Sequence, residues 1–168
     1  MTGARITAIF NDQDLQRGLR ALRMMAADSL PLMTAIGSAL VKTSQARFDS
    51  ATDPAGHAWA ALRPAYAAEK RGPGILRESG LLQRSLTFRA GYGQVEVGTN
   101  RVYGAVHQFG ATIRPKNTPA LVFRMGGKLV HVKSVTIPAR PYLGFGAADV
   151  AAVEERVEFA LRLATRGG

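Results

Sequence analysis

The feature that most constrains the fold is the longest uncharged stretch of the chain, which runs from Ser29 to Val41. Its thirteen residues are too few to cross a bilayer, so they indicate a buried helix. Pro31 suits the first turn of that helix, because its missing N–H would have no intrahelical partner there. We expect the helix to reach about Phe48 and to form the spine of the core. Its buried side chains should be Met33, Ile36, Leu40, Val41 and Phe48, and the small residues Gly37, Ser38 and Ala39 should let another helix approach closely.

Local patterns predict further elements on both sides of this helix. Before it, alternation predicts a strand over Arg5–Phe10, and Asn11 and Asp12 can cap a helix with an apolar stripe at Leu15, Leu19 and Leu22. Proline and glycine interrupt residues 49–74, where we expect one helical turn over 65–71. A further element should run from Ile75 through Leu82 to Leu86.

The second half of the chain predicts two hairpins and two helices. The hairpins are 86–89 with 94–98, and 121–125 with 128–133 around Gly126-Gly127. A short helix over 103–109 should end at Gly110, and a final helix should run from about Asp149 to Thr165. Its apolar face should carry Val150, Val153, Val157, Leu161 and Ala164.

Together these elements predict an α+β fold. We expect two N-terminal helices and a C-terminal helix to pack on an antiparallel sheet. An extended basic β-hairpin should form an arm at about residues 111–136. No internal repeat or long linker divides the chain, so residues 1–168 are predicted to form a single domain.

The positive charge of the chain is concentrated in its middle. Residues 61–146 hold thirteen basic and three acidic residues, which equals the net charge of +10 of the whole chain. No acidic residue occurs between Glu96 and Asp149, a span with seven Lys or Arg. A basic surface can attract nucleic acid or an acidic protein partner, or it can simply be a solvated face, and charge alone does not decide between them.

The sequence offers little material for catalysis or metal binding. It contains no cysteine, and its three histidines are too far apart in sequence for a metal-ligand pair at helical spacing. Gly91-Tyr-Gly93 lacks the helix and lysine that a phosphate-binding loop requires. Ser79 lacks the glycine two residues earlier that a nucleophile elbow needs. We therefore expect no enzyme activity, cofactor or metal.

Three residues stand out as candidates for structural or binding roles. Trp59, the one tryptophan, is expected to anchor the irregular 50–74 segment to the core. His107 is either a pH-sensitive contact or, as we favour, a histidine that hydrogen-bonds across its own fold. Arg140 is held between Ala139 and Pro141, and its guanidinium can bind a carbonyl or carboxylate in fixed geometry.

The basic hairpin suggests two binding modes. Arg114, Lys116, Arg124, Lys128 and Lys133 alternate with Phe123, which roughly fits a groove that follows a nucleic-acid backbone. One aromatic residue is a poor stacking platform, however, and no nucleic-acid-binding fold signature is present. We favour an arm that docks on an acidic protein surface, because its alternation suits strand addition and its charge resists self-aggregation.

Several short motifs occur in an order that resembles the phage virion morphogenesis family, which includes Mu-like G proteins and tail completion proteins. They begin with Pro54-Ala-Gly56-His-Ala-Trp59, Ile75-Leu76, Ser79-Gly80-Leu81-Leu82 and Val97-Gly98-Thr99. They end with Tyr103-Gly-Ala-Val-His107-Gln108-Phe109-Gly110 and Ile137-Pro-Ala-Arg140-Pro141-Tyr142-Leu143-Gly144. The similarity covers roughly residues 5–165, and the family has no catalytic residues to transfer.

The resemblance implies a structural protein at the neck of a virion, assembled in the host cytoplasm. Such proteins complete or terminate the tail and join it to the head, typically as a six-fold ring. The implied partners are further copies of the chain, the tail tube protein and the head–tail connector or stopper protein, with genome DNA passing through the lumen without sequence-specific binding. The alternative is a head morphogenesis or DNA-packaging accessory protein that binds DNA non-specifically.

A ring requires two complementary patches on each subunit. We infer that the basic arm of one subunit meets its neighbour near Glu154, Glu155 and Glu158 in the final helix.

Overall fold

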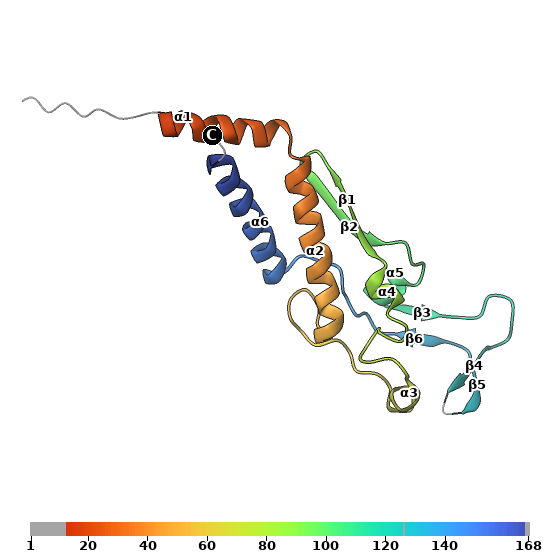
Figure 1. The fold of residues 1–168 in the computed structure, drawn as a ribbon. Helices are drawn as coiled ribbons and strands as arrows, with labels where there is room; N and C mark the ends of the chain where they lie inside the picture. The colour runs from red at the N-terminus through yellow and green to blue at the C-terminus, as the bar shows by residue number, and fades with distance from the viewer. Residues whose placement is uncertain (1–12, 126, 167–168) are drawn as a thin grey trace, which may run out of the picture.

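A computed structural model of the chain describes residues 13–125 and 127–166. The strand expected at Arg5–Phe10, and the cap expected at Asn11 and Asp12, lie outside these residues. The centre of the fold is the long helix α2, Leu30–Ser50. Helices α1, Gln13–Ala27, and α6, Ala147–Arg166, pack against each other, and α6 also packs along α2 (Figure 1). The α+β class is confirmed.

Helix α2 begins where its sequence indicates and buries a narrower face than expected. A proline occupies its first turn, and the helix ends at Ala51, whose φ of 54° is left-handed. Ile36 and Phe48 are buried, whereas Met33, Leu40 and Val41 are half-buried. Gly37 faces a strand instead of the expected helix.

The closest neighbour of Gly37 is the hairpin of β1, Leu86–Gly91, and β2, Gln94–Thr99. A Cβ on Gly37 would lie 2.2 Å from the ring of Phe88 in β1. Glycine therefore lets this hairpin lie directly on the helix.

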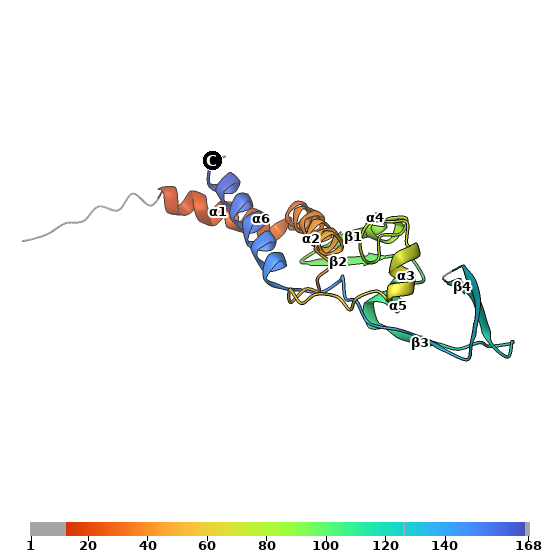
Figure 2. The same ribbon diagram turned by 90° about the horizontal axis from the view of Figure 1, so that it is seen from below.

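Within residues 13–125 and 127–166 the strands form three separate two-stranded antiparallel sheets, which corrects the expectation of one sheet beneath the helices. The first is β1–β2. The second pairs β3, Ala111–Ile113, with β6, Val135–Ile137, and the third pairs β4, Leu121–Met125, with β5, Lys128–Val132. Of these three described sheets, β1–β2 packs on α2, whereas the other two lie in the segment that projects away from the helices (Figures 1 and 2).

Three short helices connect these parts: α3, Pro64–Glu69; α4, Leu81–Arg84; and α5, Gly104–Phe109. The element expected over 75–86 is thus reduced to the single turn of α4. The core is small and consists of Phe48, Trp59, Leu82, Leu86 and Tyr142. It gathers at the C-terminal half of α2, where these short helices meet the chain near residue 142.

The terminal helices are more exposed than their sequence patterns indicate. Leu19 and Leu22 are 57% and 49% exposed, so their part of the predicted stripe is not buried, and the side chain of Leu15 lies outside the description. On α6, Val150 is exposed and the other four predicted apolar residues are half-buried. No helix in the described ranges has the length and apolarity needed to span a membrane.

Candidate assembly interface

The two segments with the most distinctive sequences, 103–110 and 137–144, pack against each other. The backbone N–H of Arg140 donates to the carbonyl of His107 at 2.7 Å. Gly110 ends α5 with a φ of +73°, and a Cβ there would lie 2.8 Å from the backbone nitrogen of Ala139. Glycine is therefore required both by the backbone conformation and by the close approach of the second segment.

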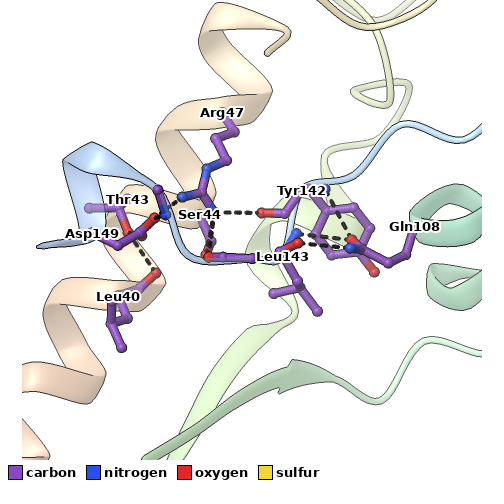
Figure 3. A network of polar contacts seen from close by, with 10 residues as sticks. Leu40, Thr43, Ser44, Arg47, Gln108, Tyr142, Leu143 and Asp149 are labelled. Atoms are coloured by element: carbon purple, nitrogen blue, oxygen red, sulfur yellow. Dashed lines mark hydrogen bonds and ion pairs between the residues drawn. The ribbon is translucent and has the colours of Figure 1, made fainter. Parts of the chain in front are cut away.

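Gln108 makes the principal connection between these segments (Figure 3). Its Nε2 donates to the carbonyl of Leu143 at 2.7 Å, and its Oε1 accepts the N–H groups of Tyr142 and Leu143 at 3.0 and 2.9 Å. One side chain thus satisfies three backbone groups of a segment that belongs to no helix or strand. We expected a hydrogen bond across the fold from His107, and Gln108 makes such bonds instead.

The ring of His107 lies in a different environment. Its Nδ1 is buried and has no hydrogen-bond partner in the described part of the chain, which corrects the expectation that it bonds across the fold. Burial, and secondarily the charge of Arg140, lower the pKa of His107 below its ordinary value. Its surroundings therefore favour the neutral form of the ring.

Trp59 and Arg140 attach the irregular 50–63 segment to this junction. The Trp59 Nε1 donates to the carbonyl of Pro141 at 2.9 Å, and its ring meets that of Phe48 edge to face at 5.5 Å. Arg140 is buried and donates to the carbonyls of Ala60 and Ala61 at 2.8 and 3.2 Å. Its guanidinium thus binds carbonyls of its own chain.

A buried ion pair, which sequence reasoning missed, joins α2 to the start of α6 (Figure 3). Arg47 donates to Asp149 and to the carbonyl of Tyr142 at 3.0 Å. The carboxylate of Asp149 also accepts bonds from Thr43 and from the N–H of Gly146. One signal in the sequence could have indicated this pair. Arg47 precedes Phe48 on the apolar face of the predicted helix, and a charge that is buried there needs a partner of opposite charge.

Residues 111–136, hereafter the arm, leave this junction as two successive ribbons. The short β3–β6 ladder forms the base, and the β4–β5 hairpin stands at the far end (Figure 2). The five basic residues of the arm, Arg114, Lys116, Arg124, Lys128 and Lys133, are all exposed. The arm contains no acidic residue, so its charge is uncompensated along its own length.

One face of the β4–β5 hairpin is apolar, and the other carries Arg124 and His131 beside the exposed Val122 and Leu129. Phe123 pairs with Val130 across the ladder, and Leu121 pairs with Val132, so these side chains share one face. The intervening residue Arg124 lies on the opposite face because side chains alternate along a strand. The apolar face lines a groove of about 530 Å³ between the arm and the body of the protein.

The groove is mainly apolar and has a polar patch. The body contributes Leu62, Tyr66 and Leu81, and the arm contributes Phe123, Val130 and Val132. His107 and Arg140 also line it, as does Tyr103, whose ring meets that of His107 edge to face at 6.1 Å. Phe109, by contrast, is 77% exposed and contributes little to the junction. The described residues contain no group of three or more His, Cys, Asp or Glu that could hold a metal ion.

The acidic residues proposed to meet the arm lie at the other end of the molecule. Glu154, Glu155 and Glu158 are exposed on α6, and the figures place α6 far from the β4–β5 hairpin (Figures 1 and 2). Glu155 pairs with Arg156 at 3.1 Å and Glu158 with Arg162 at 3.0 Å, both at the surface. Within one chain the arm and this face do not meet.

Comparison with known proteins gives a consistent assignment. The sequence model of the phage virion morphogenesis family matches residues 10–162. The chain is 30% identical over 137 residues to "Putative capsid assembly protein G" of Escherichia phage Mu, covering 76% of this chain and 78% of the relative. It is 27% identical over 150 residues to Mu-like prophage FluMu G protein 2 of Haemophilus influenzae, covering 89% and 91%. No solved structure gives a significant match.

Proposed function

Because the chain belongs to the phage virion morphogenesis family, we propose that it completes the tail of a phage particle and joins it to the head. Membership gives a structural or assembly role in the virion. The proposal is more specific: a ring, six-fold in the related tail completion proteins, at the head-proximal end of the tail. Its partners would be the tail tube protein on one side and the connector or stopper protein of the head on the other. We propose a structural part and not an enzyme.

The observation that carries this proposal is the separation of two unlike surfaces on one chain. The arm projects at one end of the molecule, and α6 lies toward the other (Figure 1). The arm is basic, whereas α6 carries the exposed residues Glu154, Glu155 and Glu158. Surfaces that differ and lie apart suit a head-to-tail contact, which generates a closed ring when the rotation between subunits closes. A two-fold dimer would instead require one patch that complements itself.

The first test is electron microscopy of particles made by the phage from which this gene has been deleted. Full heads beside unjoined tails are the expected result, and plasmid-borne protein should restore joined particles. Empty or malformed heads with normal tails would refute the tail role and place the protein in head assembly.

A second test addresses the arm. Plasmid-borne protein with the double charge reversal Arg124→Glu/Lys128→Glu should no longer restore joined particles to the deletion phage, since two exposed positive charges become negative. The matched control is Lys42→Glu/Arg101→Glu, which makes the same change of charge at exposed positions outside the arm. If both variants restore joined particles equally well, the arm is not the contact.

The second candidate is an accessory protein of head assembly or DNA packaging. It is favoured by the name of the Mu relative, which refers to capsid assembly, and by the basic middle of the chain. If the five basic residues of the arm neutralise five phosphates, the slope of log affinity against log salt is about −4.5. That candidate would be supported if the protein binds duplex DNA with this slope and the Arg124→Glu/Lys128→Glu variant does not bind it. A ring that only surrounds passing DNA would show weak binding that vanishes by physiological salt.

A further inference from the structure

One side of the arm is a long strand edge. Lys133 and Ser134 alone separate β5 from β6, so residues 128–137 form a nearly continuous strand without proline. The other side is interrupted between β3 and β4, where Pro115 and Pro119 lie, and α3 lies beside β4. In the described part of the chain β5 pairs with β4 and β6 with β3, and no third strand joins either pair. The outer side of β5 and β6, hereafter the open edge, is therefore a template for strand addition.

The register of the β4–β5 ladder determines which backbone groups point to the open edge. Hydrogen-bonded and non-hydrogen-bonded pairs alternate along an antiparallel ladder. Met125 and Lys128 flank the two-residue turn and form the hydrogen-bonded pair that closes it. Leu129 and His131 belong to the alternate pairs, so their N–H and C=O groups are directed outward, where another strand can bind them.

The groove between the arm and the body follows the same strand. Val130 and Val132 of β5 line it, as do the three residues of β6, Val135–Ile137. About 530 Å³ of space lies between this strand and the body. A strand added at the open edge would direct every second side chain toward the groove and the others outward. The occupant must therefore be extended, with apolar side chains on one face.

The segment Arg5–Phe10, for which the sequence predicts a strand, meets both requirements. Ile6, Ala8 and Phe10 fall on one face and the residues between them on the other. Its β-branched and aromatic residues are those that strands favour. The exposed apolar residues of α1 and α6 do not qualify, because a helix uses its backbone groups within itself.

Charge does not oppose this pairing. Residues 6–11 are uncharged, and Arg5 and Asp12 place one charge of each sign at the two ends. The basic arm would repel a basic strand, but it has no such effect on an uncharged one.

The segment is too short to reach the open edge of its own chain. Arg5 lies eight positions before Gln13, the first residue of α1, so the segment extends at most about 29 Å from there. Helix α2 alone is about 31 Å long. The start of α1 and the arm lie at opposite ends of the molecule, with α2 between them (Figures 1 and 2). A segment that binds this edge must belong to another copy of the chain.

We infer that Arg5–Phe10 of a second copy adds as a strand to the open edge, with Ile6, Ala8 and Phe10 over the groove. The edge lies at one end of the molecule and the segment is attached at the other, so the contact repeats head to tail. This inference rests on the proposed ring and identifies the two surfaces that build it.

Disulfide formation between two single-cysteine variants tests the pairing, because the chain contains no cysteine of its own. One variant carries His131→Cys on the open edge, and tags of different length distinguish mixed from like pairs. The other carries Ile6→Cys, Thr7→Cys, Ala8→Cys or Ile9→Cys. A disulfide requires ~4.4–6.8 Å between Cα atoms, and directly opposed residues of neighbouring strands lie about 5.5 Å apart. Both variants are produced together in cells infected with the deletion phage, and both purified particles and concentrated full-length protein are oxidised.

An alternating pattern of mixed disulfides is the expected result. His131 is exposed on the face away from the groove, so it should pair with Thr7→Cys or Ile9→Cys and not with Ile6→Cys or Ala8→Cys. The control replaces His131→Cys by Val102→Cys, at a position that is 93% exposed and outside the arm, and should give no mixed pair. Equal yields at all four positions would overturn the inference, as would absence of the mixed pair from both preparations. A disulfide between His131→Cys and a different virion protein would overturn it in favour of another occupant.

A second test acts on the backbone. On this pairing the N–H groups of Thr7 and Ile9 are directed at β5, and proline removes such a donor. Thr7→Pro should therefore abolish the disulfide formed by Ile9→Cys, and Ile9→Pro the one formed by Thr7→Cys. The matched control Thr2→Pro makes the same change before the segment and should leave the disulfide. An undiminished disulfide in the first two variants would contradict the inference.

The contact and the function can fail separately. A mixed disulfide that forms while the deletion phage makes normally joined particles would leave the contact intact and remove the tail role. Unjoined tails in the deletion phage, without a mixed disulfide between the variants, would do the reverse.

Discussion

The buried pair of Arg47 and Asp149 allows a quantitative test of what holds the fold together. We consider Asp149→Asn, which keeps the shape of the side chain and removes its charge. Arg47 is 6% exposed and Asp149 is fully buried, so the variant leaves a guanidinium in the interior without its counter-ion. The carbonyls of Tyr142 and Gly144, at 3.0 and 3.3 Å, still accept its hydrogen bonds but do not neutralise it.

Removing one partner of a buried pair costs about 3–5 kcal/mol of unfolding free energy. That is a large share of the roughly 5–15 kcal/mol that stabilises a typical domain. The double variant Arg47→Met/Asp149→Asn removes both charges and should cost about as much as one single variant. The coupling between the two positions should thus equal the cost of one single variant, about 3–5 kcal/mol, which is at or above the upper end of the range for residues in contact.

Urea unfolding followed by fluorescence measures these costs, since Trp59 is the single tryptophan and is 5% exposed in the core. With an m-value of about 2 kcal/mol/M, a loss of about 4 kcal/mol lowers the midpoint by about 2 M. Far-UV circular dichroism should give the same midpoint if unfolding is two-state. The matched control is Glu158→Gln, which breaks a pair whose side chains are 63% and 67% exposed. It should cost less than about 1 kcal/mol. Equal midpoints for Asp149→Asn and this control, or strictly additive single costs, would refute the reasoning.

Three further predictions follow from other contacts. Gly37→Ala should destabilise the protein by about 1–3 kcal/mol, because overpacking against Phe88 outweighs the helix propensity that alanine gains, and a raised urea midpoint would contradict this. Gln108→Leu leaves three backbone groups without a partner and should cost at least about 1–3 kcal/mol, whereas a midpoint equal to that of the parent would show that water replaces the amide. The lowered pKa of His107 means that stability is full above pH 6.5 and falls as the pH drops toward the folded-state pKa. In thermal melts from pH 7.5 to 5, His107→Gln should flatten that fall, and an unchanged profile would exclude the histidine as its source.

Local signals in the sequence predicted most individual elements. Pro31 marked the first turn of α2, the glycine pairs marked the hairpin turns, and Gly110 marked the end of α5. Each of these depends on backbone conformations that a few neighbouring residues determine. The order of short motifs also predicted the family that comparison confirms.

Contacts between distant segments could not be predicted in the same way. A hairpin pattern in the sequence predicts that two strands pair with each other. It does not predict whether a third strand pairs with either edge of that hairpin, so the number of sheets could not be predicted. The partners Arg47 and Asp149 are 102 residues apart, and no local rule connects them. His107 and Gln108 are adjacent and both polar, so only the direction of each side chain decides which one holds the segment at Tyr142. The direction of the Arg140 side chain could not be predicted either. The sequence therefore did not indicate that its guanidinium binds carbonyls of its own chain.

The position of Tyr142 in the core has a consequence for the newly made chain. Phe48 emerges from the ribosome early, but the ring of Tyr142 that packs against it and the carboxylate that neutralises Arg47 follow about ninety to one hundred residues later. At roughly 5–20 residues per second this interval lasts on the order of 5–20 s. During that time α2 exposes its apolar face and an unpaired cation. The core around Phe48 therefore cannot be completed until the chain has been made almost to its C-terminal helix.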